Sequence, residues 1–446
     1  MINECIYISN NLINRLDIPV QEEILVRVGS RIIKSRLIVS SSRKYSYMLS
    51  PSLARALLFK KHKRLKIRYD KHANIIHLGP TIGILSSFLP NREEFDPKSV
   101  QAELIYLSNI GRKISGQVYI FTPSSINWAN KTTRGYQYRQ LSSERGIWVS
   151  SEYPLPDVVY DRIPSRTSEA KHTISETKWR LVKLPYLKYF NPSFLNKWKV
   201  HQLLITNPEL HPYLPETKHL NLVNLETMLL KYNTLFLKPA NGSLGKGIIK
   251  LVQDEKGTLH YTIYRRGQTK SQAGNAAEFM KKTKVYRGER TYVVQQGIKL
   301  AKYMNSTFDI RIIFQKNNKG EWQVGKKFVR IAPRGSSISN LSSGGRAEKS
   351  KKVFRQLYKS QQMIDEKNQL IKVLCKKVAD TLEKTSKSTF GELGLDIGVD
   401  INGFPWLIEV NSKPRKTTES EYSQGIVRNS FKRPLEYGSY LAGFGN

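Results

Sequence analysis

The stretch that most constrains the fold is ELGLDIGVDINGFPWLIEVNSKP, residues 392–414, where apolar residues alternate with carboxylates and amides. The dipeptide Asn402-Gly403 lies between two alternating runs, which is typical of a two-residue hairpin turn. With that turn, Ile401 pairs with Phe404 and the register of the whole ladder follows. The sequence therefore predicts a β-hairpin whose successive side chains point to opposite faces.

In this register Asp396 lies opposite Glu409, and Gly394 lies opposite Asn411. Like charges placed opposite each other destabilise a hairpin unless a positive group lies between them. One interpretation is a half-exposed hairpin whose polar face meets water. The other is a hard-cation site, because two carboxylates and an amide oxygen suit Mg²⁺.

The same register predicts which side chains face the protein core. Ile408 falls on an apolar face together with Leu395, whereas Leu407 falls on the polar face with Asp396.

The charge of the chain is unusual. Its 446 residues include 73 Lys and Arg against 36 Asp and Glu, a net charge of +37. Such a field favours anionic partners. A local cluster, KKHKRLKIRYDKH at residues 60–72, is compatible with nucleic-acid binding. Its alternation of apolar and charged residues favours a solvated strand, so we expect no nucleic-acid partner.

Cys5 and Cys375 are isolated, which excludes a disulfide framework or a cysteine-based metal site. No apolar run approaches the ~18 residues of a membrane span, and the N-terminus lacks a signal-peptide pattern. We therefore expect a cytoplasmic protein without a membrane partner.

Local patterns predict a mixed α/β (α+β) protein with several parts. Residues 1–80 read as a β-rich region and residues 81–185 as a small α/β domain. Residues 186–432 alternate strands with glycine loops and include a long helical segment at about 353–387. Residues 433–446 form a tail without a readable pattern.

A second informative stretch is LFLKPANGSLGKGIIKL, residues 235–251, in which an apolar strand leads to Lys238. A loop with little steric restriction follows, and its backbone N–H groups could surround an anion beside the lysine. It does not match a Walker A loop, and a glycine-rich hairpin loop is the alternative. The loop residues of interest are Gly242, Ser243, Gly245 and Gly247.

Residues 308–333 read as two strands that carry Asp309, Arg311 and Arg330. Planar guanidinium groups suit the binding of phosphate or carboxylate. Asp309 and Arg311 share a face by alternation, so a simple surface ion pair between them is the alternative.

Taken in order, these pieces resemble the ATP-grasp superfamily. The series also includes Lys197 in NKWKVHQLL and the linker VVQQGI at residues 293–298. The segments NPELHPYLPET and FDIRIIFQKNNKGEWQV are similar to the YheC/YheD family of endospore-associated ATP-grasp proteins. The resemblance covers about residues 185–432 and implies an ATP-grasp fold preceded by the β-rich and α/β regions.

The resemblance implies a nucleotide site. Lys197 and Lys238 would contact the phosphates of ATP, and the loop of residues 242–247 would fold over them. Backbone groups around Gln296 and Ile298 would meet the adenine edge.

It also implies a metal and substrate site. Asp396, Glu409 and Asn411 match the family's ligands for Mg²⁺, with two ions possible in such a site. Arg311 and Arg330 match positions that hold the phosphate or acyl group. Asn340, with Gly344-Gly345 nearby, lies where the family closes over its substrates.

One departure concerns the linker. Many ATP-grasp enzymes hold the ribose with a carboxylate there, whereas this sequence has Gln295-Gln296.

The activity implied is that of an ATP-dependent carboxylate–amine ligase acting through an acylphosphate, on an unidentified carboxylate substrate that the positive charge suggests is acidic. The family name also implies an association with sporulation and the spore coat. An alternative of a different class is a non-catalytic, nucleotide-binding structural protein of the coat.

Overall fold

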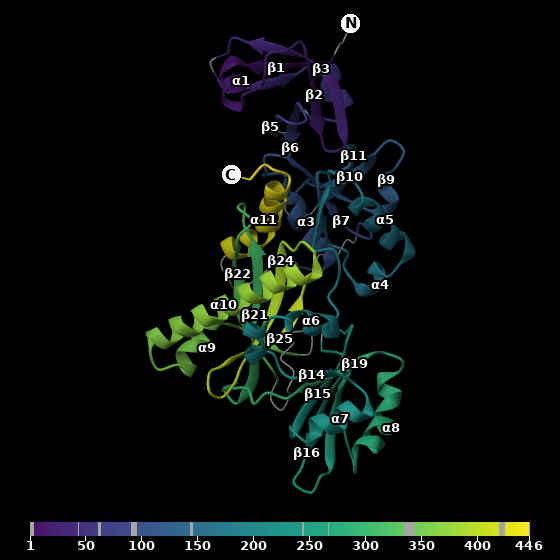
Figure 1. The fold of residues 1–446 in the computed structure, drawn as a ribbon, viewed down its shortest axis with the longest axis vertical. Helices are drawn as coiled ribbons and strands as arrows, with labels where there is room; N and C mark the ends of the chain where they lie inside the picture. The colour runs from purple at the N-terminus through teal and green to yellow at the C-terminus, as the bar shows by residue number, and fades with distance from the viewer. Residues whose placement is uncertain are drawn as a thin grey trace.

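The part of the chain that the structure describes forms four β-sheets with helices packed against them (Figure 1). In Figure 1 the N-terminal sheet lies at one end of the molecule, and the sheet that contains β14–β19 lies at the other. The computed structural model describes residues 4–42, 44–60, 64–90, 96–142, 146–242, 245–265, 267–333, 344–418 and 424–445.

The N-terminal sheet has six strands in the order β4-β1-β3-β2-β6-β5. Its core includes Ile6, Ile8, Val26 and Leu53, all fully buried. Part of the basic cluster at residues 60–72 forms β5, as the alternation predicts. The elements are β1 (Cys5–Ser9), α1 (Asn10–Leu16), β2 (Glu23–Val28), β3 (Arg31–Ser40), β4 (Tyr47–Leu49), α2 (Pro51–Ala56), β5 (Lys66–Asp70) and β6 (Ile75–Gly79).

The next sheet and its helices form what we call the α/β unit. The strand order is β11-β10-β8-β7-β12-β13, with β9 paired to β10, and β7 runs parallel to β8 and β12. Its elements are β7 (Thr81–Leu85), α3 (Val100–Gly111), β8 (Gln117–Phe121), β9 (Ile126–Asn127), β10 (Thr132–Gln140), β11 (Gly146–Pro154), β12 (Val158–Asp161), α4 (Arg166–Glu169), α5 (His172–Val182) and β13 (Lys188–Phe190).

The last helix of the chain, α11 (Gln424–Leu441), returns to the α/β unit. Val427, Phe431 and Leu435 are buried in one core with residues of β7, β8 and β12. The sequence-based limit between residues 432 and 433 falls inside this helix, and the supposedly unreadable tail is largely helical. Pro434 interrupts the apolar pattern there without ending the helix.

A third sheet, the distal sheet, has the order β14-β19-β15-β16-β17-β18. Residues of α7 and α8 share its core with those strands, and both helices lie beside it in Figure 1. Its elements are β14 (Thr217–His219), α7 (Leu222–Leu229), β15 (Thr234–Pro239), β16 (Ile248–Gln253), β17 (Leu259–Tyr264), β18 (Gln268–Ala273), α8 (Ala276–Arg287) and β19 (Tyr292–Gln296).

The fourth sheet, the central sheet, has the order β23-β22-β21-β24-β25, with β20 paired to β21. Its elements are β20 (Lys302–Tyr303), β21 (Ser306–Lys316), β22 (Trp322–Ile331), β23 (Arg346–Lys349), α9 (Ser350–Leu357), α10 (Gln361–Ser386), β24 (Glu392–Val399) and β25 (Pro405–Asn411). The preceding helix α6 (Lys197–Leu204) also contacts α10.

The helical segment predicted at residues 353–387 is two helices, α9 and α10. The chain is extended at Tyr358 (φ −120°, ψ 135°). Ser360 then caps α10, because its side chain accepts a hydrogen bond from the backbone N–H of Met363 at 3.2 Å. A side-chain cap of this kind satisfies a backbone donor that the first helical turn leaves unpaired.

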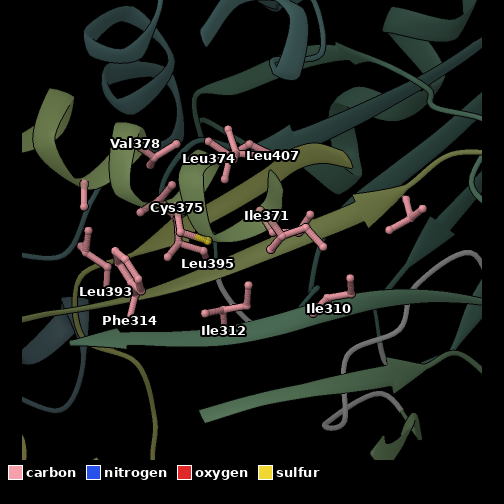
Figure 2. Close-up of a cluster of buried hydrophobic side chains, with 14 of the residues drawn as sticks. Ile310, Ile312, Phe314, Ile371, Leu374, Cys375, Val378, Leu393, Leu395 and Leu407 are labelled. Atoms are coloured by element: carbon pink, nitrogen blue, oxygen red, sulfur yellow. The ribbon is translucent and has the colours of Figure 1, made fainter. Parts of the chain in front are cut away.

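The largest hydrophobic core lies between α10 and the central sheet. Figure 2 shows Ile371, Leu374, Cys375 and Val378 from α10 close to side chains from three strands. Those strand residues are Ile310, Ile312, Phe314, Leu393, Leu395 and Leu407. Among the described residues, no helix is long and apolar enough to span a membrane.

Buried ion pairs join the central sheet to the α/β unit. Glu392 of β24 is fully buried and pairs with Arg162 at 3.0 Å and with Lys416 at 2.7 Å. Burial would raise the pKa of Glu392, but Lys416 and Arg162 lower it below its ordinary value. A second set lies close by, in which Lys413 pairs with Asp161 at 2.7 Å and with Glu169 at 2.8 Å.

Leu395 supports the strand on which Asp396 lies. Its side chain is fully buried, so Leu395→Ala leaves a cavity, and we expect it to lower the free energy of unfolding by about 3 kcal/mol. The matched control is Ile401→Ala at the hairpin tip, where the side chain is 57% exposed and the loss should stay below about 0.5 kcal/mol. Urea unfolding of both variants measures the difference, and equal losses would contradict this packing.

Candidate functional site

The hairpin of β24 and β25 differs from the predicted one at its tip and agrees with it further down. Asp396 pairs with Glu409 and Gly394 with Asn411, as predicted. The predicted pair of Ile401 with Phe404 is wrong, because Asp400 donates its backbone N–H to the Phe404 carbonyl at 3.0 Å. The loop therefore has three residues, 401–403.

The side chain of Asp400 explains the longer loop. Its Oδ1 accepts hydrogen bonds from the backbone N–H groups of Asn402 and Phe404, each at 2.9 Å. Its Oδ2 accepts one from Trp406 Nε1 at 3.0 Å. Gly403 takes a positive φ of 76°, a conformation that glycine tolerates without strain.

A bulge restores the register before the carboxylates. Asp396 pairs with Glu409, but the next residue, Ile397, pairs with Leu407, which leaves Ile408 extra. Between the three-residue loop and this bulge the faces of β25 are the reverse of those predicted, as Leu407 and Ile408 show. Leu407 lies in the core at 4% exposure, whereas Ile408 lines the cavity described below.

The opposed carboxylates are surrounded by cations of the protein. Asp396 Oδ1 lies 2.8 Å from Arg311 Nη1, and Asp396 Oδ2 lies 2.8 Å from Arg330 Nη2. Glu409 Oε1 lies 3.2 Å from Lys197 Nζ. These three groups offset the like-charge repulsion of the Asp396–Glu409 pair.

The pairing of the strands places both arginines next to the carboxylates. Arg311 of β21 is opposite Asp396 of β24, and Arg330 of β22 is opposite Asp309. Arg330 Nη2 lies 2.7 Å from Asp309 Oδ1. Asp309 thus pairs across the strands with Arg330. Burial would lower the pKa of Arg330, but Asp396 and Asp309 raise it above its ordinary value.

The two lysines reach the site from different elements. Lys197 is the first residue of α6, and its Nζ also donates to the Gly242 carbonyl at 2.7 Å. Lys238 of β15 donates to Gln295 Oε1 at 2.5 Å. Burial, with a smaller contribution from Lys197, lowers the pKa of Lys238 to about 8, while Glu409 and Asp396 act in the opposite direction.

The pKa of Glu409 is shifted by the same neighbouring charges. Its burial would raise the pKa of the carboxyl, but Lys197, Lys238 and Arg311 lower it below the ordinary value. Glu409 is therefore anionic at neutral pH, as a cation ligand must be.

A cavity of about 520 Å³ lies between the distal and central sheets and brings most of the predicted site residues together. Gly247, Arg311 and Asn411 are not among its lining residues. Ser243 and Asn340 lie outside the described residues. The predicted residues that line the cavity are Lys197, Lys238, Gly242, Gly245, Gln296, Ile298, Arg330, Asp396 and Glu409.

Two glycines in the loop after Lys238 take positive φ values, which other residues rarely adopt. Gly245 and Gly247 have φ values of 71° and 79°. Gly247 is anchored at its end, because its N–H donates to the Tyr264 carbonyl at 2.7 Å and its carbonyl accepts from the Tyr292 hydroxyl at 2.9 Å.

The glutamines of the linker have structural partners. Gln295 Nε2 donates to Thr217 Oγ1 at 2.9 Å, and Gln296 Oε1 accepts from the backbone N–H of Glu216 at 3.1 Å. Both side chains thus hold β14 against β19, and both residues contribute to the cavity wall.

Asn411 lies two residues beyond Glu409 on β25, beside Gly394. A Cβ at Gly394 would stand 3.2 Å from Arg311 Nη1 and 3.7 Å from Asn411 Cβ. The bare glycine therefore leaves room for Arg311 and Asn411 to lie together. Among the described residues, no three His, Cys, Asp or Glu side chains form a metal-binding group.

Sequence reasoning missed several cationic residues around the site. Four more lysines line the cavity, and burial lowers the pKa of Arg166 in the α/β unit while Glu169 and Glu409 act in the opposite direction. Lys299 directly follows the predicted linker, so its position was a usable signal, whereas nothing local pointed to Arg166. The four lysines are Lys246, Lys250, Lys299 and Lys302.

Comparison with known families identifies the class of protein that this fold and site define. The model of the YheC/D-like ATP-grasp family matches residues 186–441, and the chain belongs to this family. The resemblance inferred from the motifs is thereby confirmed.

Two curated relatives come from Bacillus subtilis (strain 168). The endospore coat-associated protein YheD is 30% identical over 423 residues, which cover 93% of this chain and 90% of YheD. The endospore coat-associated protein YheC is 29% identical over 329 residues, covering 72% and 87%. Among solved structures, D-alanyl-alanine synthetase A from Vibrio cholerae overlaps 82% of this chain and 98% of its own, with 14% identity and a TM-score of 0.47.

The shifted pKa of Lys238 can be measured directly. We expect the Lys238 amine to titrate near pH 8 in an NMR titration of the protein with isotopically labelled, dimethylated lysines. Glu409→Gln should lower that pKa further, because the Glu409 carboxylate stabilises the charged lysine. Glu278→Gln on the surface of α8 is the control and should leave it unchanged. Titration of Lys238 at pH 10 or above would contradict the burial described here.

Proposed function

We propose that the cavity binds MgATP and that the protein is a carboxylate–amine ligase. The observation that carries the proposal is the opposition of Asp396 to Glu409 at a cavity lined by several cations. Membership in an ATP-grasp family supports the same function.

The residues around the carboxylates fit Mg²⁺. Asp396, Glu409 and Asn411 would hold it, because carboxylate and amide oxygens are the ligands that Mg²⁺ prefers. Asp396 and Glu409 line the cavity, and the pKa of Glu409 is lowered by neighbouring cations. When bound, Mg²⁺ neutralises phosphate charge.

The nucleotide would extend along the cavity. Lys238, Lys197 and the loop of residues 242–247 would bind its phosphates, because cations and backbone N–H groups stabilise phosphate oxygens. Backbone groups of Gln296 and Ile298 would meet the adenine. The side chains of Gln295 and Gln296 already hold β14 and β19 together, so we assign neither of them to the ribose.

The proposed reaction has two steps. A substrate carboxylate oxygen attacks the γ-phosphorus of ATP, and ADP leaves with the bridging oxygen, which gives an acylphosphate. The nitrogen of an amine then attacks the acyl carbon, phosphate leaves with the C–O oxygen, and the nitrogen loses a proton. Arg311 and Arg330 would offset the charge that develops on the transferred group. The resemblance to the ATP-grasp superfamily also implies a substrate contact for Asn340, which lies outside the described residues.

The net charge of +37 supports an acidic carboxylate substrate. The names of YheD and YheC support a role at the spore coat. They also leave a second candidate, a coat protein that binds nucleotide without turning it over.

Glu409→Gln tests the proposal. We expect calorimetric ATP affinity in the presence of Mg²⁺ to fall at least tenfold in the variant, because an amide is a poorer ligand for a hard cation than a carboxylate. Glu289→Gln, at an exposed position on the distal sheet's side of the molecule, is the control. ADP release from wild type with a pool of amino acids and short acidic peptides then separates the ligase from the structural candidate.

Two outcomes would count against the proposal. If wild type binds no ATP, the nucleotide site is wrong. Wild type may instead bind ATP tightly, and more tightly than Glu409→Gln does, while no member of the pool stimulates ADP release. That result would favour the coat protein that binds nucleotide without turning it over.

The pH dependence of ATP binding follows from Lys238. Its pKa is lowered to about 8, so the lysine loses its positive charge as the pH rises through 8. A bound anion favours the charged form and raises this pKa, so affinity should fall above pH 8 by up to about tenfold per pH unit. Calorimetry between pH 7 and 9.5 should show this fall in wild type and in Lys281→Met, and it should be absent in Lys238→Met.

A further inference from the structure

The wall of the cavity between the distal and central sheets carries more cations than its carboxylates balance. Among the described residues that line it, the acidic ones are Asp309, Asp396 and Glu409. Each of these carboxylates already lies within 3.2 Å of an arginine or lysine nitrogen. Three lysines that take no part in those ion pairs also line the cavity, and they are Lys250, Lys299 and Lys302.

Lys302 lies well away from the carboxylate pair. It pairs with Thr307 across strands β20 and β21, and cross-strand partners point to the same side of a sheet. Arg311, which pairs with Asp396, follows Thr307 by four residues on β21, a distance of about 13 Å along an extended strand. Lys302 is exposed, and within the described part of the chain it forms no ion pair.

The backbone that carries Lys302 is held in place by the hairpin of β24 and β25. The Ala301 N–H donates to the Val399 carbonyl at 2.8 Å, and the Ile401 N–H donates to the Lys299 carbonyl at 3.1 Å. Lys299 and Lys302 therefore reach the cavity from a segment whose backbone is anchored.

Lys250 reaches the cavity from the opposite wall. It is a half-buried residue of β16 and lies opposite Phe236 of β15. Phe236 in turn pairs with Gln295 of β19, and it precedes Lys238 by two residues, about 7 Å along the strand. Burial, and to a smaller extent the charge of Lys302, lowers the pKa of Lys250. This direction agrees with the positions of the two lysines on the distal and central walls of one cavity.

A second hollow, of about 190 Å³, adjoins the cavity at Lys250, which lines both. Cross-strand pairing continues from Lys250 to Thr262 of β17 and then to Lys270 of β18, and both of these residues line the hollow. Its lining also includes His260, whose Nε2 lies 2.8 Å from Asp254 Oδ2. The hollow therefore offers ammonium groups and a hydroxyl group beside the cavity, away from the carboxylates.

We propose that Lys250 and Lys302 bind a phosphate carried by the ribose of the nucleotide. In the proposed function, residues 296–298 meet the adenine and Lys238 binds the 5′-phosphates, so the ribose lies between them and beside Lys250. A lysine ammonium binds phosphate as a compact point charge. The inference rests on the proposed function, because that function sets the direction of the nucleotide. An adenine nucleotide phosphorylated on its ribose would therefore compete with ATP for the cavity.

Two other roles for the lysines compete with this one. They could contribute only a general positive field, which would attract nucleotides of equal charge alike. They could instead bind an acidic group of the second substrate. The reacting carboxylate must reach the γ-phosphate beside Asp396, however, and Lys302 lies about 13 Å from that position along the sheet. In that role the lysines would add no affinity for a phosphate on the ribose.

The experiment uses the full chain and four adenosine nucleotides. Calorimetry in Mg²⁺ measures the affinity for the 5′-monophosphate, the 5′-diphosphate, the 2′,5′-bisphosphate and the 3′,5′-bisphosphate. The last three differ only in where the second phosphate is attached. The variants are Lys250→Met and Lys302→Met, which remove the charge and keep most of the side-chain length, and Lys302→Arg, which keeps the charge. Lys281→Met, at an exposed position of α8, is the matched control.

We expect wild type to bind at least one of the bisphosphates about tenfold or more tightly than the monophosphate, because the added phosphate gains charge-assisted hydrogen bonds to the lysines. Lys250→Met and Lys302→Met should reduce this gain to less than about threefold, while the 5′-diphosphate keeps its own gain over the monophosphate. Lys302→Arg and Lys281→Met should keep both gains. The bisphosphate that binds more tightly identifies the ribose oxygen that carries the phosphate.

Three results would overturn the inference. In the first, neither bisphosphate binds wild type more tightly than the monophosphate does. In the second, the gain survives in both lysine-to-methionine variants. In the third, these variants reduce the gains of the bisphosphate and the 5′-diphosphate equally, as the loss of a general field would. Absence of any nucleotide binding by wild type is a different failure, because it overturns the proposed function and the inference with it.

Discussion

The interaction on which the site depends is the opposition of two carboxylates, Asp396 and Glu409, on neighbouring strands. Cations from other elements make it tolerable, and each comes from a different part of the fold. Lys197 begins α6, Arg311 lies on β21 and Arg330 on β22. Because an unpaired buried charge is costly, the carboxylate pair ties the placement of these elements to one another.

Much of this could be predicted from the sequence. The alternation around Asp396 and Glu409 gave the correct pairing, and the order of motifs gave the family that the family model confirms. The hairpin tip was wrong because the dipeptide rule considers only the turn residues, whereas Asp400 accepts three hydrogen bonds that stabilise a longer loop. A bulge at Ile408 compensated for that error, so the pairing of the carboxylates survived it.

Other features depend on contacts between residues far apart in the chain, which local patterns do not encode. Arg166, for example, donates to the Leu195 carbonyl at 2.6 Å, and the two residues are 29 apart in the chain. The break between α9 and α10 lies at an extended Tyr358 and is followed by the cap at Ser360, within a segment whose apolar spacing continues as if the helix were unbroken. Tertiary packing likewise explains why α11 is helical. Its Pro434 and glycines are unfavourable in a helix, but its apolar residues are buried in the core of the α/β unit.

The buried ion pairs of Glu392, Lys413 and Lys416 have a mechanical consequence. Separating the α/β unit from the central sheet would part Glu392 from Arg162 and Lys413 from Asp161. The distal sheet is joined to the rest of the molecule by the chain segments 205–216 and 297–301 and by hydrogen bonds such as that from Lys197 Nζ to the Gly242 carbonyl at 2.7 Å. Buried charge pairs therefore join the α/β unit to the central sheet, so a substitution that removes one partner affects both units at once.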